Sequence, residues 1–147
     1  MKKILIVFTV ILTAFLFTSC ATMQSIPPEQ RTHFFEANYN QTFKAIVSYC
    51  NDKGFPIVMV DKDLGIINTD WKMNDGVSKF LVGDQKLKIN FAVSEVKHSE
   101  DSTRVMAIVS AVKSGAFGRE SSITMTKGRA KDYYDIIYKG IEERIER

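Results

Sequence analysis

The acidic side chains that could bind a cation stand close together in this chain, but their spacing matches no common site. Asp61, Asp63 and Asp70 lie within ten residues of one another. An EF-hand loop that began at Asp61 would need a glutamate at its twelfth position, where this chain has Lys72. The segment 61–65 contains Asp and Gly, which are typical of turns. We therefore predict a turn there and no metal site.

Histidines and nucleophiles lack the neighbours that catalysis requires. His33 and His98 are the only histidines, and no second histidine or cysteine stands at zinc-binding spacing from either. Serines are frequent in residues 114–122, but neither a Gly-x-Ser-x-Gly motif nor a nearby base accompanies them. Residues 115–118 also lack the Lys-Ser/Thr pair of a phosphate-binding loop. We therefore predict that the protein is not an enzyme and binds no cofactor; an enzyme acting on the cell wall is the least favoured hypothesis.

Cys20 is the residue whose surroundings indicate a specific chemistry. Lys2 and Lys3 precede an apolar run over 4–17, and two small polar residues separate that run from Cys20. A basic segment, a hydrophobic segment and a small-residue cleavage site form a secretory signal. With cysteine directly after the cut, this segment resembles the signal of bacterial lipoproteins. The resemblance implies that the Cys20 thiol is acylated and that Cys20 becomes the N-terminus of the mature protein.

A lipoprotein signal has two alternatives, a transmembrane helix and a plain secretory signal. A transmembrane helix needs about 20 residues, and the apolar run 4–17 is about 14 residues long. A plain secretory signal with an incidental cysteine is the closer alternative. If the protein is a lipoprotein, Ala21 after the cysteine implies the outer membrane, with the domain facing the periplasm. Several acyl chains would anchor the protein stably, because each buried methylene contributes about 0.8 kcal/mol.

Length and charge indicate one tethered domain. Removing the first 19 of 147 residues leaves 128, enough for a single domain with its own core. Lys and Arg then number 18 against 17 acidic residues, so no overall basic field indicates nucleic acid as a partner. Composition divides the chain into a signal peptide (1–19), a lipidated tether (20–34) that lacks apolar periodicity and contains Pro27 and Pro28, and one domain (35–147).

Apolar periodicity predicts two helices. Residues spaced three and four apart predict a helix over 41–53, capped by Asn40 and ended by Gly54. Cys50 lies on its apolar face and is predicted to be a small buried core residue. A second stripe predicts a helix from 128 to the C-terminus, which Gly140 should weaken slightly. Its members are Ala130, Tyr134, Ile137, Ile141 and Ile145.

Between the helices, β-branched and alternating apolar runs predict strands. The runs are 55–60, 66–71, 80–82, 87–93 and 105–112. Strands grouped between two helices favour an antiparallel sheet that packs against them. We therefore predict an α+β domain with four to five antiparallel strands, an N-terminal helix and a long C-terminal helix.

One segment carries a family resemblance. The helix over 41–53 is followed by Gly-Phe-Pro-Ile at 54–57, by Asp61 and by Gly-Ile-Ile-Asn-Thr-Asp-Trp at 65–71. This order resembles the repeat domain of BamC (NlpB), a lipoprotein family of the outer-membrane β-barrel assembly machinery. The resemblance implies a helix-grip fold, with a long helix across an antiparallel sheet, and an accessory role in docking on partner proteins. The same residues also have roles in folding alone, since Gly54 ends a helix and Gly65 turns a hairpin.

Two segments are candidates for binding a partner. Phe117 and Arg119 lie in the glycine-containing loop 114–122, and Met73 and Val77 flank the turn signal Asn-Asp-Gly at 74–76. The preferred hypothesis is a membrane-anchored envelope lipoprotein that acts as a non-catalytic protein-binding or assembly accessory module. The alternative is a carrier or sensor of a small apolar ligand, held in a pocket between helix and sheet.

Overall fold

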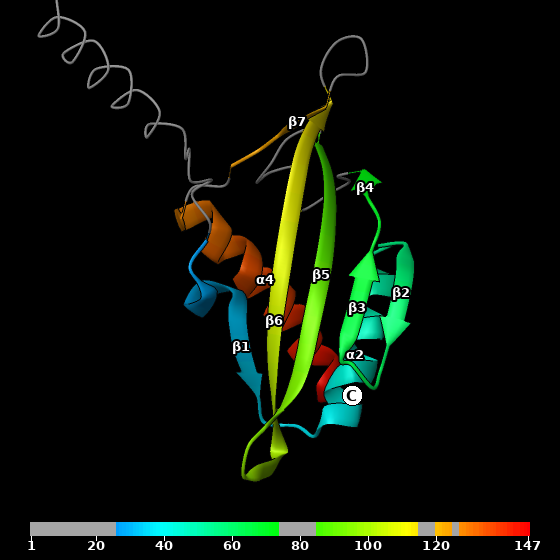
Figure 1. Ribbon diagram of the computed structural model, residues 1–147, viewed down its shortest axis with the longest axis vertical. Helices are drawn as coiled ribbons and strands as arrows, with labels where there is room; N and C mark the ends of the chain where they lie inside the picture. Colours follow the sequence, from blue (N-terminus) through cyan, green and yellow to red (C-terminus); the bar gives the residue numbers. More distant parts are fainter. Residues whose placement is uncertain (1–25, 74–84, 115–119, 125–126) are drawn as a thin grey trace, which may run out of the picture.

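The computed structural model describes residues 26–73, 85–114, 120–124 and 127–147. They form one antiparallel sheet with two α-helices on the same face (Figure 1). The elements are η1 (Pro28–Arg31, a 3-10 turn), β1 (Thr32–Phe35), α2 (Tyr39–Asp52), β2 (Ile57–Asp61), β3 (Ile66–Thr69), β4 (Lys72–Met73), β5 (Gln85–Val96), β6 (Ser99–Ser114), β7 (Glu120–Ser122) and α4 (Lys127–Ile145). The α+β class is confirmed.

The sheet has seven described strands rather than the four to five predicted. Its order is β1-β6-β5-β3-β2, and in addition β4 pairs with β5 and β7 pairs with β6. The long hairpin of β5 and β6 is its centre, with a continuous register from Gln85↔Lys113 to Glu95↔Thr103. The predicted strand 80–82 lies outside the described residues.

Two of the additional strands, β1 and β7, are short and pair with β6, whereas the two-residue β4 pairs with β5. Residues 28–34 were predicted to belong to an irregular tether, which is wrong for this stretch, because η1 and β1 occupy it. β1 pairs with β6 from Thr32↔Met106 to Phe35↔Thr103. Likewise, Glu120–Ser122 forms β7 on β6, where a loop was predicted as far as residue 122. Four-residue and three-residue strands have too little periodicity to be recognised alone, and their distant partner stabilises them.

The helix α2 begins two residues earlier than predicted. Asn38, not Asn40, is its N-cap, and the Asn38 side chain accepts a hydrogen bond from the Gln41 backbone N–H at 2.9 Å. Cys50 is fully buried, as predicted. Burial raises the pKa of the Cys50 thiol to about 12, so this thiol stays protonated at neutral pH and is a poor nucleophile.

The apolar stripe of α4 packs on the sheet, as predicted, and two of its tyrosines also satisfy the β6 backbone. The Tyr138 hydroxyl accepts from the Ala107 N–H at 3.2 Å and donates to the Arg31 carbonyl. The Tyr134 hydroxyl accepts from the Val109 N–H at 3.3 Å. Both N–H groups lie beyond the end of β1, where no described strand pairs with this side of β6, although β5 pairs with its other side. The tyrosines therefore replace a missing strand while they fill the core.

Gly140 has a packing role that its helix propensity did not predict. A Cβ atom at Gly140 would lie 2.6 Å from Cε2 of Tyr49, closer than real Cβ contacts. The missing side chain allows α4 to approach α2 at this point. One turn further on, Arg144 forms an ion pair with Asp52 at 2.7 Å and lies over the Tyr49 ring, 5.4 Å from its centroid. Glycine therefore lowers the helix propensity of α4 at this position, but it permits the close contact between α4 and α2.

Candidate functional site

Most of the predicted partner-binding residues lie outside the described part of the chain. These are Val77, Phe117 and Arg119; Cys20, the predicted lipidation site, also lies outside the described residues. Met73 is described: it ends β4, faces away from the helices opposite Lys86 in register, and is 59% exposed.

The described residues that flank the two predicted segments lie at one end of the sheet. Met73 pairs with Lys86 on β5, and Glu120 pairs with Ser114 at the start of β7. The Lys86 ammonium forms an ion pair with the Glu120 carboxylate at 2.6 Å. The strand pairing thus brings together the ends of two segments that the sequence separates by some forty residues.

A different surface stands out among the described residues, and it was not predicted. Val58 is 63% exposed, Met59 45%, Val60 48% and Leu64 68%. These are four of the eight exposed large hydrophobic residues in the described part of the chain, and all four belong to β2 and the turn after it. Isolated exposed apolar residues are normal, whereas several of them on one strand and its turn form a candidate interaction surface.

β2 is also an edge strand of the described sheet. It pairs with β3 on one side, and no described strand pairs with its other side. At an edge strand, the outward backbone N–H and C=O groups are those with which another strand can pair. Proteins usually protect such edges with charges or bulges. β2 has a bulge at Val58, yet no charged residue precedes Asp61 in the strand. We call the β2 strand together with Leu64 the edge site.

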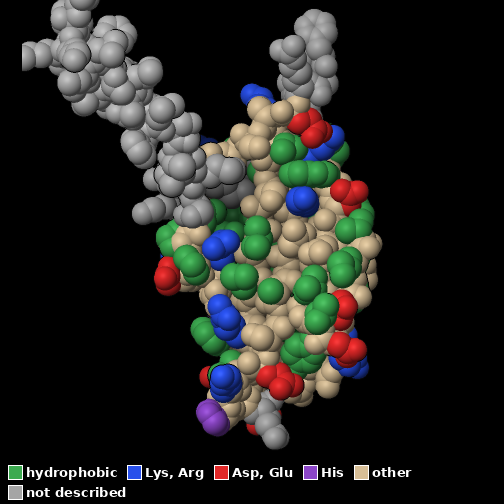
Figure 2. All heavy atoms as spheres, in the orientation of Figure 1, with side chains coloured by type: hydrophobic (Ala, Val, Ile, Leu, Met, Phe, Trp, Pro, Cys, Tyr) green, Lys and Arg blue, Asp and Glu red, His purple; other side chains and the backbone are tan. Residues whose placement is uncertain are grey.

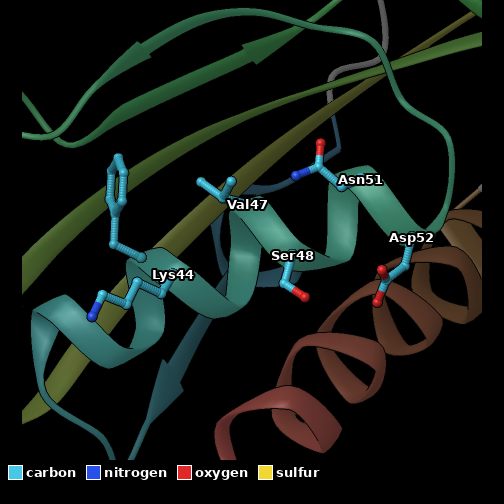
Figure 3. A pocket seen from close by; sticks show the side chains of 6 residues that line it. Lys44, Val47, Ser48, Asn51 and Asp52 are labelled. Atoms are coloured by element: carbon cyan, nitrogen blue, oxygen red, sulfur yellow. The ribbon is translucent and has the colours of Figure 1, made fainter.

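A hollow of about 480 Å³ lies on the outer surface of α2. Figure 3 shows it along one side of the helix, beneath the β2–β3 hairpin, with Val47 and Asn51 pointing toward the hairpin side. Its lining is Phe43, Lys44, Val47, Ser48, Asn51 and Asp52. Phe43 is buried, so it forms an apolar floor, whereas Lys44 and Asp52 are exposed at the rim. Figure 1 likewise places α2 behind β2 and β3.

Two contacts fix the hairpin turn that ends the edge site. The Tyr39 hydroxyl, at the start of α2, donates a hydrogen bond to the Lys62 carbonyl. Desolvation, with the nearby carboxylates of Asp63, Glu95 and Asp61, raises the pKa of Tyr39, so its hydroxyl keeps the proton that it donates. Within the turn, Asp61 Oδ1 accepts from the Leu64 N–H at 2.8 Å. Asp61 therefore has a turn-forming role, as the sequence predicted.

Gly65 holds the same turn against β5. Its φ of +69° lies in the left-handed region, and its carbonyl accepts from the Val93 N–H at 2.7 Å. An added Cβ would lie 2.0 Å from the Val93 carbonyl oxygen. Only glycine therefore fits this close approach of two backbones.

The arrangement is suited to recognition of an extended peptide. An unpaired strand edge supplies backbone hydrogen bonds, and the neighbouring hollow can receive side chains of an added strand. Among the described residues, no three His, Cys, Asp or Glu side chains gather closely enough to hold a metal ion. In the same part of the chain, no helix is both long and apolar enough to cross a bilayer.

No family model matches the chain, and no curated protein matches it significantly.

Replacing Gly65 with alanine should destabilise the hairpin far more than the same change at Gly54. Both glycines have φ +69°, so alanine costs about 1–2 kcal/mol of backbone strain at either position. Around Gly54 the nearest atoms belong to the Lys72 side chain at 3.8 Å, an ordinary contact. Gly65→Ala adds the collision with the Val93 carbonyl. Urea unfolding of both variants measures the difference between their free energies of unfolding. Equal losses of stability would contradict the close approach of Gly65 to the Val93 carbonyl.

Proposed function

We propose that this protein is a lipid-anchored lipoprotein of the bacterial envelope, exported by residues 1–19, acylated at Cys20 and carried on the outer membrane facing the periplasm. Its α+β domain is a non-catalytic module that binds an extended segment of another envelope protein. The proposal extends the lipoprotein-like signal and the BamC-like segment seen in the sequence. A helix-grip relation to that family is part of the same proposal.

The exposed apolar edge of β2 is the observation that carries the binding role. A strand added there would gain the main-chain hydrogen bonds that β2 offers. Its side chains would alternate, so that one set faces the hollow on α2 and the other continues the opposite face of the sheet. Val60 is paired with the buried Ile67 and therefore faces the helix side of the sheet, the side on which α2 and its hollow lie. This gives the edge site both a hydrogen-bonding and an apolar component.

The alternative function, a carrier of a small apolar ligand, has less support. The space between the described helices and the sheet contains large buried side chains: Phe43, Phe55, Phe91 and Tyr134 are each at most 7% exposed. The hollow on α2 is open on the surface rather than enclosed between helix and sheet. Mass spectrometry of the purified protein tests this alternative through any lipid that copurifies.

Replacing Cys20 with serine should release the protein from the membrane. A serine hydroxyl cannot replace the thiol in acylation, so the anchor would not form. Cys50→Ala is the matched control, because Cys50 is the other cysteine and is buried in the domain. After cell fractionation, the Cys20→Ser variant should be in the soluble fraction and the Cys50→Ala variant in the membrane fraction. Membrane retention of the Cys20→Ser variant would refute the anchor.

A photo-crosslinking residue at Val58 should capture one defined segment of an envelope protein in living cells. Ile136 is the matched control, since it is a β-branched residue of α4 that is 42% exposed. Position 136 should give no such crosslink, because α4 offers no strand edge. Adding Val60→Lys to the position 58 probe should abolish capture, since a charge would enter the apolar part of the edge site.

The crosslinked peptide should be identified by mass spectrometry, together with the stability of each variant by urea unfolding. Substitutions of exposed residues usually change the free energy of unfolding by less than about 0.5 kcal/mol. If the variant that fails to crosslink is as stable as the others, unfolding does not explain its loss of capture. Equal capture from positions 58 and 136 would contradict a specific edge site. Capture of a second copy of this chain would show that the edge joins two copies instead of binding a partner.

A further inference from the structure

The face of the sheet opposite α2 and α4 is not covered by any described helix. We call this the outer face; it consists of the strand residues that alternate with the buried core residues. Figure 2 views the molecule from this side, in the same orientation as Figure 1, where the strands lie in front of both helices. The composition of this face is informative, because the uncovered face of a sheet is usually clearly polar.

Much of the outer face is apolar. In the register of the sheet, Ile66, Ala92 and Met106 lie side by side on β3, β5 and β6. One pleat further along, Ile108 is 40% exposed, and on β1 Phe34 is 58% exposed. Figure 2 shows hydrophobic side chains spread across the strands rather than gathered in one hollow. The surface is therefore wide and shallow, unlike the narrow edge site.

Basic side chains lie between these apolar residues. Arg104 is exposed beside Phe34, its partner in register. Lys88 places its ammonium 5.0 Å from the ring centroid of Trp71, which is half-buried. The acidic residues that share this face lie at its margins, where Glu120 pairs with Lys86 and Asp61 ends β2. Figure 2 likewise shows most of the Asp and Glu side chains near the outline of the face.

The chain enters the domain at the β1 edge of this face. Ile26, the first described residue, packs partly against the core, and η1 contacts β1, β6 and α4. Six residue steps separate Cys20 from Ile26. A fully extended chain spans at most about 3.3–3.6 Å per residue, so Ile26 is within about 20 Å of an anchor at Cys20. Along β1, the first residue on the outer face is Thr32, opposite Met106, and Phe34 follows opposite Arg104.

We propose that the outer face rests on the surface of the bilayer that holds the anchor. This proposal rests on the lipid anchor of the proposed function. Basic residues complement anionic headgroups, and aromatic and aliphatic side chains enter the interfacial region. The short tether raises the effective concentration of the bilayer next to this face. Weak contacts are therefore sufficient to hold the face on the bilayer. In this orientation the edge site on β2 lies at the margin of the face and stays accessible to a protein partner.

The test compares the depth of two matched positions in the lipidated full-length protein. Ile108→Cys places a fluorophore on the outer face, and Ile136→Cys places one on α4, at 40% and 42% exposure of the native side chain. Cys50 is fully buried and Cys20 would be acylated, so labelling is confined to the introduced cysteine. Each protein is incorporated into vesicles of phosphatidylethanolamine and phosphatidylglycerol with brominated acyl chains.

The expected result is loss of fluorescence and a blue shift at position 108, with neither change at position 136. Raising the salt concentration should weaken the effect at position 108, because the headgroup contacts are electrostatic. If the protein floats with the vesicles but both positions stay unquenched, or are quenched equally, the orientation is refuted and the anchor is retained. If the protein does not float with the vesicles, both the anchor and the orientation are refuted. Crosslinking of position 108 to a protein in cells would also overturn the orientation, in favour of a protein that covers this face.

Discussion

Burial of one sheet face beneath two helices is the constraint on which the rest of this structure depends. α4 crosses β6 and fills the core with Tyr134 and Tyr138, whose hydroxyls also bind backbone N–H groups that no described strand reaches. α2 then packs beside α4, and the contact of Tyr49 with Gly140 requires the absence of a side chain at residue 140. Since both helices lie on the same side, the outer face and the β2 edge are left without a described cover. The surfaces proposed for binding are therefore direct consequences of the packing.

The same packing also holds the turn that ends the edge site. Tyr39 at the beginning of α2 holds the turn after β2, and Gly65 holds that turn against Val93 of β5. An edge strand fixed at its turn loses little conformational entropy when a second strand adds to it. The two proposals assign different parts of the molecule to different partners: the outer face would contact lipid, and the β2 edge would bind protein.

Local signals in the sequence were sufficient for the long elements. The helix predicted at 41–53 was found at Tyr39–Asp52, and the alternating run 87–93 lies within β5. The buried stripe of α4 was also predicted correctly, because a repeat of three and four residues identifies one helix face. β1 and β7 were missed, since a strand of three or four residues is defined by its distant partner on β6 rather than by its own pattern.

Of the candidate site, the sequence could predict the strand at β2 and the turn at 61–65. It could not predict the exposure of Val58 and Val60, because an apolar run reads the same in a core strand and at an uncovered edge.

Amide hydrogen exchange of β2 tests the central claim most directly. The intact protein should be compared in isolated cell envelopes and after purification in detergent, with exchange measured for peptides that cover Ile57–Asp61 and, as an internal reference, the central strand β5. The account predicts slower exchange of β2 in the envelope, because a partner strand would bind its outward N–H groups, and unchanged exchange of β5. Equal exchange of β2 in the two samples would show that this edge has no partner and would contradict the account.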